Sequence, residues 1–153
     1  MILPPPLRKG DVVAILSPSG AAVRDNVEKA AQAIRSCGYE VRIMPHALGR
    51  HGSFSGSVGE RLSDFTEAWR DPRVKALLCS RGGYGAVHLL PALDSLRLEE
   101  TPKRLIGFSD ISALHALMQY RGMASLHGPQ TRHLALHPDD SDPCTAALFG
   151  ALE

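Results

Sequence analysis

The sequence predicts an α/β fold, a doubly wound and mostly parallel five-stranded sheet with helices on both faces, of the flavodoxin or Rossmann type. Short apolar runs alternate with amphipathic helical stretches five times along the chain, which is typical of parallel sheets covered by helices. The first run, residues 12–16, is apolar throughout, as expected of a strand buried on both faces. In such sheets ligands bind beyond the carboxyl ends of the strands, so the loops after the strands are expected to hold the site.

The first half of the chain contains two strand–helix units. Residues 24–37 follow the first strand with apolar side chains at helical spacing, and a glycine then ends the helix. Residues 39–44 are the second predicted strand, and residues 49–59, rich in Gly and Ser, are expected to form an exposed loop. A second helix runs through Trp69 until Asp71-Pro72 stops it. The apolar positions of these two helices are Val27, Ala30, Ala31, Ile34, Leu62, Phe65 and Trp69.

The second half repeats the alternation three times. The strands are expected at residues 74–79, 104–108 and 123–126. Helices are expected at residues 86–93, 110–120 and 144–152, the middle one with Ile111, Leu114, Leu117 and Met118 facing inward.

Composition indicates one globular domain without a nucleic-acid or membrane partner. Of 153 residues, 44% are hydrophobic and 22% charged, and the formal net charge is +1. No apolar run approaches the roughly 20 residues that span a bilayer. A signal peptide has basic residues followed by a long apolar stretch, whereas this N-terminus has apolar residues followed by basic ones, so a cytoplasmic protein is expected. Three widely spaced cysteines, Cys37, Cys79 and Cys144, are expected to be reduced and mostly buried.

The segment Gly107-Phe108-Ser109-Asp110 lies between a predicted strand and a predicted helix. A serine on a tight turn there would expose its hydroxyl above a helix N-terminus, whose free N–H groups and partial positive charge favour a developing anion. This is the logic of a nucleophile elbow, although the pattern is not G-x-S-x-G. From these four residues alone, the favoured interpretation is that Ser109 is a helix N-cap and that Asp110 complements the helix dipole.

The segment Arg81-Gly82-Gly83-Tyr84-Gly85 follows the neighbouring strand. Paired glycines suit either an oxyanion-hole loop, which presents backbone N–H groups, or a simple tight connection, and the segment alone does not separate the two. Seven histidines show no H-E-x-x-H or clustered Cys/His spacing, so no metal site is expected. His115 is interpreted as structural, whereas His127, at the end of a strand, is a candidate for catalytic work.

Several segments together resemble the serine-type LD-carboxypeptidase family, which includes murein tetrapeptide carboxypeptidases and microcin-immunity relatives. The likeness extends to about residue 135, and five motifs occur in register. They are Pro6–Asp11 leading to Ser17-Pro18-Ser19, Glu60-Arg61-Leu62 through Asp71–Val74, Arg81–Gly85, Gly107–Leu114 and His127-Gly128-Pro129.

The resemblance implies Ser109 as the nucleophile, with an oxyanion hole from the backbone N–H groups of Asp110 and of Gly82 or Gly83. Arg81, Tyr84 and His127 are expected near the substrate. The resemblance also implies a cytoplasmic homodimer that needs no cofactor or metal and removes the terminal D-alanine from murein tetrapeptides in cell-wall recycling.

The family's general base is a histidine held by a glutamate, and both belong to a second, C-terminal domain. Residues 1–153 are therefore expected to be the N-terminal, nucleophile-bearing domain, inactive without its C-terminal domain. Two rival interpretations are a non-catalytic domain on the same fold and a nucleotide-binding domain. The hypothesis of a nucleotide-binding domain is disfavoured because no G-x-G-x-x-G follows the first strand and no G-K-[ST] occurs.

Overall fold

The computed structural model describes residues 1–153 and contains one five-stranded sheet with strand order β2-β1-β3-β4-β5. Every strand pair is parallel, which confirms the predicted fold class. The strands are β1 (Val12–Leu16), β2 (Glu40–Ile43), β3 (Val74–Cys79), β4 (Arg104–Gly107) and β5 (Leu126–His127). Parallel pairing brings the carboxyl ends of all five strands to one edge, so the loops after β1, β3, β4 and β5 meet there.

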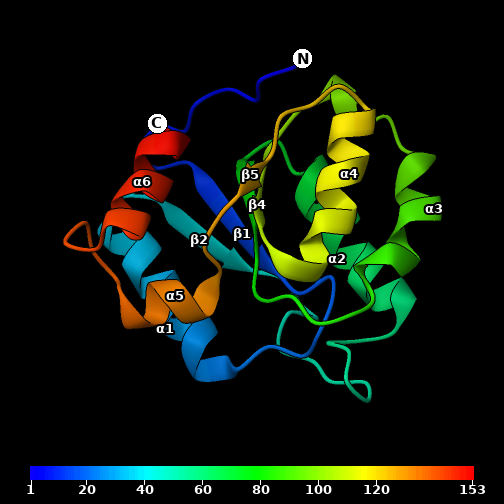
Figure 1. Cartoon of the computed structure of the whole chain (residues 1–153), viewed down its shortest axis with the longest axis horizontal. Coiled ribbons are helices and arrows are strands. Elements are labelled where there is room, and N and C mark those ends of the chain that lie inside the picture. Colours follow the sequence, from blue (N-terminus) through cyan, green and yellow to red (C-terminus); the bar gives the residue numbers. More distant parts are fainter.

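Helices cover both faces of the sheet (Figure 1). The helices are α1 (Arg24–Ser36), α2 (Val58–Arg70), α3 (Leu90–Asp94), α4 (Ser112–Tyr120), α5 (Thr131–Leu136) and α6 (Pro143–Leu152). Three short 3₁₀ helices complete the chain: η1 (Ala86–Leu89), η2 (Leu98–Glu100) and η3 (Ser109–Ile111). None of the helices combines the length and the apolar character that crossing a membrane requires.

Alternate residues of the strands feed two hydrophobic cores, one on each face, as the period of two in a strand demands. Val13 and Ile15 of β1 pack with apolar side chains of α1, α5 and α6. Ala14 and Leu16 point to the opposite face and pack with side chains of α2, α3 and α4. All five residues of β1 are buried, as expected for a strand covered on both sides.

The predicted boundaries differ from the structure in a few places, each with a local cause. Helix α2 begins at Val58 because Ser57 and Glu60 form a reciprocal capping box, so the predicted loop ends earlier. Strand β5 begins only at Leu126, since the backbone of Met123 bridges Ile2 instead. Helix α5 was not predicted.

The expectation of mostly buried thiols is wrong. All three cysteines are free, but only Cys79, in the core strand β3, is buried. Cys37 is partly exposed at the end of α1, and Cys144 is exposed on the first turn of α6.

Candidate active site

Ser109 lies two residues after the end of β4 and has a φ of 63°, the only positive φ among the non-glycine residues. The left-handed region costs an L-residue roughly 1–3 kcal/mol, and residues held there cluster at functional sites. The expected N-cap role is wrong: Ser109 is the first residue of η3, and the N-cap position falls on Phe108. The turn that follows β4 leaves Ser109 exposed, which is where a nucleophile elbow places its serine.

Gly82, in the loop after β3, packs directly against Ser109. A Cβ added to Gly82 would lie 2.7 Å from the Cβ and 2.8 Å from the Oγ of Ser109, and 3.3 Å from the backbone nitrogen of Asp110. Only a residue without a side chain permits this approach. The backbone N–H of Gly82 donates no hydrogen bond within the chain, whereas its carbonyl accepts from the N–H of Gly20.

Gly83 is positioned differently from Gly82. Its φ is +121°, and an added Cβ would meet the backbone of Gly20 at 3.3 Å rather than Ser109. The two glycines therefore have different neighbours. Gly82 packs against Ser109, and Gly83 allows the chain to turn beside the loop after β1.

The carboxylate of Asp110 joins three loops at this edge of the sheet. Its Oδ2 accepts from the Ser19 hydroxyl at 2.6 Å and from the backbone N–H of Ala86 at 2.9 Å. Ser19 belongs to the loop after β1, and Ala86, the first residue of η1, directly follows residues 81–85, here called the glycine loop. The residue after the serine thus fixes the elbow and the glycine loop relative to each other.

A buried arginine supports the same loops from below. Arg61 of α2 is 2% exposed and donates from Nε to the carbonyl of Gly56 at 3.1 Å, and from Nη1 to those of Pro18 and Gly85 at 2.7 and 2.8 Å. Its guanidinium also lies 5.0 Å from the ring centroid of Phe54. Burial lowers the pKa of Arg61 from its usual value, an effect opposed by the negative charge of Asp110.

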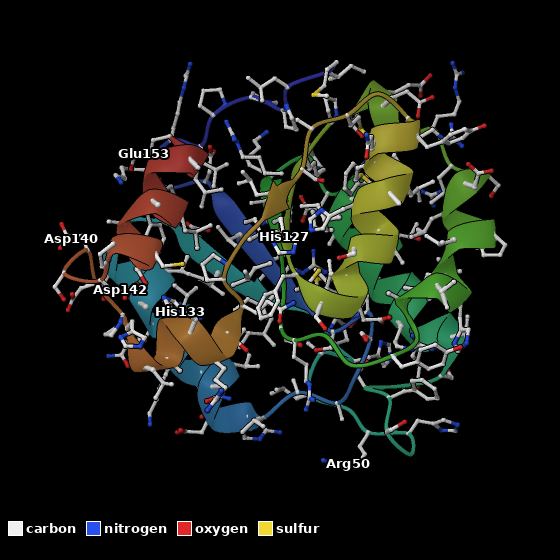
Figure 2. All side chains as sticks on the ribbon, viewed as in Figure 1. Arg50, His127, His133, Asp140, Asp142 and Glu153 are labelled. Atoms are coloured by element: carbon white, nitrogen blue, oxygen red, sulfur yellow. The ribbon has the colours of Figure 1, made fainter.

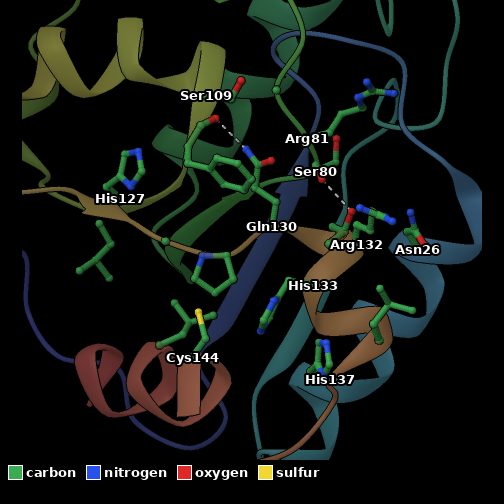
Figure 3. Close-up of a pocket in the computed structure, with 18 of the residues that line it drawn as sticks. Asn26, Ser80, Arg81, Ser109, His127, Gln130, Arg132, His133, His137 and Cys144 are labelled. Atoms are coloured by element: carbon green, nitrogen blue, oxygen red, sulfur yellow. Dashed lines mark hydrogen bonds between the residues drawn. The ribbon is translucent and has the colours of Figure 1, made fainter. Parts of the chain in front are cut away.

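A cavity of about 970 Å³ opens beside Ser109 and is shown in Figure 3. The glycine loop and the elbow form one side, the segment after β5 crosses its middle, and α5 and α6 form the opposite wall. The polar or ionisable residues that line it include Asn26, Ser80, Arg81, Ser109, His127, Gln130, Arg132, His133, His137 and Cys144. Its volume is typical of a site for a small molecule or a short peptide.

Buried hydroxyl and amide groups hold the floor of the cavity. The hydroxyl of Ser80 is 2.6 Å from that of Ser17, and Thr131 donates to the carbonyl of Ser80 at 2.7 Å. Gln130 donates from Nε2 to the carbonyl of Phe108 at 3.1 Å, next to the elbow. These bonds tie the start of α5 to the loops after β3 and β4, so the cavity wall and Ser109 are positioned together.

The other predicted site residues divide between the cavity and the exterior. Arg81 lines the cavity and donates to the carbonyl of Ala21 at 3.2 Å. Tyr84 is 62% exposed and packs on Phe54 and His88, outside the cavity lining.

His127 lines the cavity, pairs with Gly107 in the sheet, and makes no side-chain hydrogen bond to Ser109. By contrast, both ring nitrogens of His115 are engaged, by Ser125 at 2.7 Å and by the carbonyl of Gly107 at 2.9 Å. Burial lowers the pKa of His115 from its usual value, which agrees with a structural role.

Comparison with known proteins assigns the family. The family described as the LD-carboxypeptidase N-terminal domain, peptidase S66, matches residues 13–128. The murein tetrapeptide carboxypeptidase of Pseudomonas aeruginosa is 37% identical over 127 residues, which cover 82% of this chain and 41% of that protein. The microcin C7 self-immunity protein MccF of Escherichia coli is 27% identical over 133 residues, 84% of this chain and 38% of that protein.

Solved structures agree. An MccF-like protein from Bacillus anthracis matches with a TM-score of 0.87 and 32% identity, over 99% of this chain and 47% of that chain. MccF without ligand matches with a TM-score of 0.91 and 25% identity over the same shares. The chain spans less than half the length of these relatives. It therefore belongs to the LD-carboxypeptidase family of peptidases, and the part that it matches is the N-terminal domain.

Proposed function

We propose that this chain carries the nucleophile of a serine peptidase that releases the terminal D-alanine from murein tetrapeptides, and that Ser109 is this nucleophile. The observation that carries the proposal is the strained backbone of Ser109, packed against a glycine that leaves its hydroxyl accessible. A fold holds such a conformation only when the surrounding structure stabilises it, and here the Asp110 carboxylate and Arg61 brace the loops around it.

In the proposed reaction, Ser109 Oγ attacks the carbonyl carbon that precedes the terminal D-residue, and its proton passes to a general base. The tetrahedral oxyanion accepts hydrogen bonds from the backbone N–H groups of Gly82 and Asp110. Two features support these donors: the Gly82 N–H has no partner within the chain, and the Asp110 N–H lies in the first turn of η3, where backbone N–H groups lack helical partners. The C–N bond then breaks, D-alanine leaves with the proton, and water hydrolyses the acyl–serine ester.

The general base is proposed to come from a C-terminal domain outside residues 1–153. No histidine of this chain forms a hydrogen bond with Ser109, and several are already paired. His46 pairs with Asp64, His133 with Asp142, and His115 with Ser125 and a carbonyl. His127 is the local alternative, because it lines the same cavity.

Exposed apolar side chains around the site support a covering domain. Phe108, next to the nucleophile, is 43% exposed, and Leu136 on the far wall is 62% exposed; both line the cavity. Apolar side chains grouped around a cavity in this way mark an interaction surface. From the resemblance to the LD-carboxypeptidase family, we also propose that the whole protein is a cytoplasmic, homodimeric enzyme of cell-wall recycling.

A second candidate substrate comes from MccF, one of whose structures at 25% identity is a complex with aspartyl sulfamoyl adenosine. A peptidase with the same nucleophile could cleave an aminoacyl amide of this kind instead of a murein peptide. The two candidates differ in substrate and not in the role of Ser109, so a substrate panel separates them.

The test measures D-alanine release from murein tetrapeptide by three proteins: residues 1–153 alone, the chain fused to the C-terminal half of the Pseudomonas aeruginosa relative, and the fusion with Ser109→Ala. Only the unmodified fusion is expected to be active. The exposed Ser112, three residues further on, supplies the matched control Ser112→Ala, which should keep activity. Release by residues 1–153 alone would point to His127 as the base, and cleavage of only the sulfamoyl adenosine compound would replace the murein substrate.

A further inference from the structure

Three side chains with metal-binding atoms meet where α5 joins α6, on the cavity wall opposite Ser109, and a fourth lies beside them. The ligand atoms of His133, Asp142 and Cys144 all lie within 4.8 Å of one another. His137 joins them, with its ring 4.9 Å from that of His133 and its Nδ1 4.0 Å from Asp142 Oδ1. Figure 2 shows His133 and Asp142 facing each other across this junction, and Figure 3 shows His133, His137 and Cys144 bordering the cavity.

Local structure explains why these four residues come together. His133 lies on α5 and His137 caps its end, and a separation of four residues places both on one helix face. Asp142 is the N-cap of α6, and Cys144 follows in its first turn. The unpredicted helix α5 is therefore the reason why the histidine spacing carried no metal signal in the sequence.

We propose that His133, His137, Asp142 and Cys144 form a binding site for a transition-metal ion of the Zn²⁺ class. Imidazole, carboxylate and thiolate are the ligands that zinc takes in proteins, and four of them complete a tetrahedron. Zinc–ligand bonds of about 2.0–2.3 Å separate tetrahedral ligand atoms by roughly 3.3–3.8 Å, so side-chain movements on the order of 1 Å bring His133, Asp142 and Cys144 to this spacing. His137 lies outside this group of three, and its side chain must turn toward them to complete the tetrahedron. The inference goes beyond the proposed peptidase function and does not depend on it.

The helix cap and the metal site are compatible. Asp142 Oδ2 accepts from the Thr145 N–H at 2.8 Å, which caps α6, while Oδ1 is turned toward His137. In the proposed site the metal binds Asp142 Oδ1 and His133 Nε2. His133 Nε2 then gives up its present hydrogen bond to Asp142 Oδ2, which is 2.8 Å long. The cysteine thiol loses its proton to solvent on binding. A simple cap with a paired histidine would require neither Cys144 nor His137, and this difference makes the proposal testable.

The experiment titrates Zn²⁺ into the tag-free 153-residue chain under a metal-compatible reductant, against a competing chelator, and repeats the titration with Co²⁺ followed by absorbance. We expect one ion per chain and a thiolate-to-cobalt charge-transfer band. Cys144→Ser should abolish the band and weaken Zn²⁺ binding by more than the roughly 10–100-fold typical of losing an outer-shell partner. His133→Gln should weaken binding similarly.

Two matched controls use residues of the same kind elsewhere in the chain. Cys37→Ser removes a thiol outside the cluster, and His46→Gln removes a histidine that pairs with Asp64 at 2.8 Å. Both variants should bind as the unmodified chain does. Asp142→Asn retains a capping oxygen, and circular dichroism checks that each variant is folded. Absence of stoichiometric binding by the unmodified chain, or a cobalt band that survives Cys144→Ser, would overturn the proposal.

Discussion

Replacing Gly82 with alanine tests the packing of the glycine loop against the elbow. The added Cβ would lie 2.7 Å from Ser109 Cβ and 2.8 Å from Ser109 Oγ, well inside ordinary contact, so Ser109 or the loop must move. Overpacking of this kind costs about 1–3 kcal/mol. Gly82 is not in the left-handed region, so the lower entropy of the unfolded alanine chain returns about 0.4–1 kcal/mol. The free energy of unfolding should fall by a net of about 1–2 kcal/mol.

Alanine keeps the backbone N–H, but the forced movement displaces it from the oxyanion, so D-alanine release by the fused enzyme should fall by up to about 10²–10³-fold, the cost of losing one oxyanion donor outright. Urea unfolding measures the first effect and steady-state kinetics the second. Gly59→Ala is the matched control, because a Cβ there meets only the Ser57 hydroxyl at 3.9 Å. Inside α2 it should stabilise the chain slightly and leave activity intact. If Gly82→Ala leaves both unfolding and kinetics unchanged, the close approach to Ser109 has no functional meaning.

Three further predictions concern the residues around the elbow and one buried lysine. Asp110→Ala should lower the free energy of unfolding by about 3 kcal/mol through two lost charge-assisted hydrogen bonds, and Asp110→Asn, which keeps an acceptor oxygen, by about half as much. Arg61→Met should cost at least about 3 kcal/mol because three carbonyls lose their donor, and Arg61→Lys should recover only part of this. Both pairs are measured by urea unfolding, and equal values within either pair would contradict the assigned bonds. Burial lowers the pKa of Lys103 from 10.5 to about 8, so between these pH values the unfolded chain binds more protons and stability should rise with pH. Lys103→Met should remove that rise, and an identical pH profile in the variant would refute the assignment.

The strand and helix pattern was readable from the sequence because each element has its own period. The run Val12–Leu16 and the helical spacing from Val27 to Ile34 specify burial directly, and both proved correct. Helix α5 was not predicted from the sequence because it is only six residues long and has no side-chain cap. Without it, the far wall of the cavity and its histidines could not be placed.

The sequence singled out two of the segments that meet at the candidate site, but it did not give their geometry. The four residues around Ser109 fit an N-cap better than an elbow, and only the positive φ separates the two. The hydrogen bond from Ser19 to Asp110 and the hydrogen bonds of the buried Arg61 join segments that are far apart in the chain. No local sequence pattern could therefore predict them. Long-range polar contacts of this kind depend on the strand order, which the sequence leaves open.

The central claim is that Ser109 forms a covalent bond with the substrate. The most direct measurement quenches the fused enzyme in acid during turnover of murein tetrapeptide and maps the trapped tripeptide ester by peptide mass spectrometry. The account predicts an adduct on the peptide that contains Ser109, absent from Ser109→Ala and present in Ser112→Ala. An adduct on any other residue, or full turnover by Ser109→Ala, would contradict it.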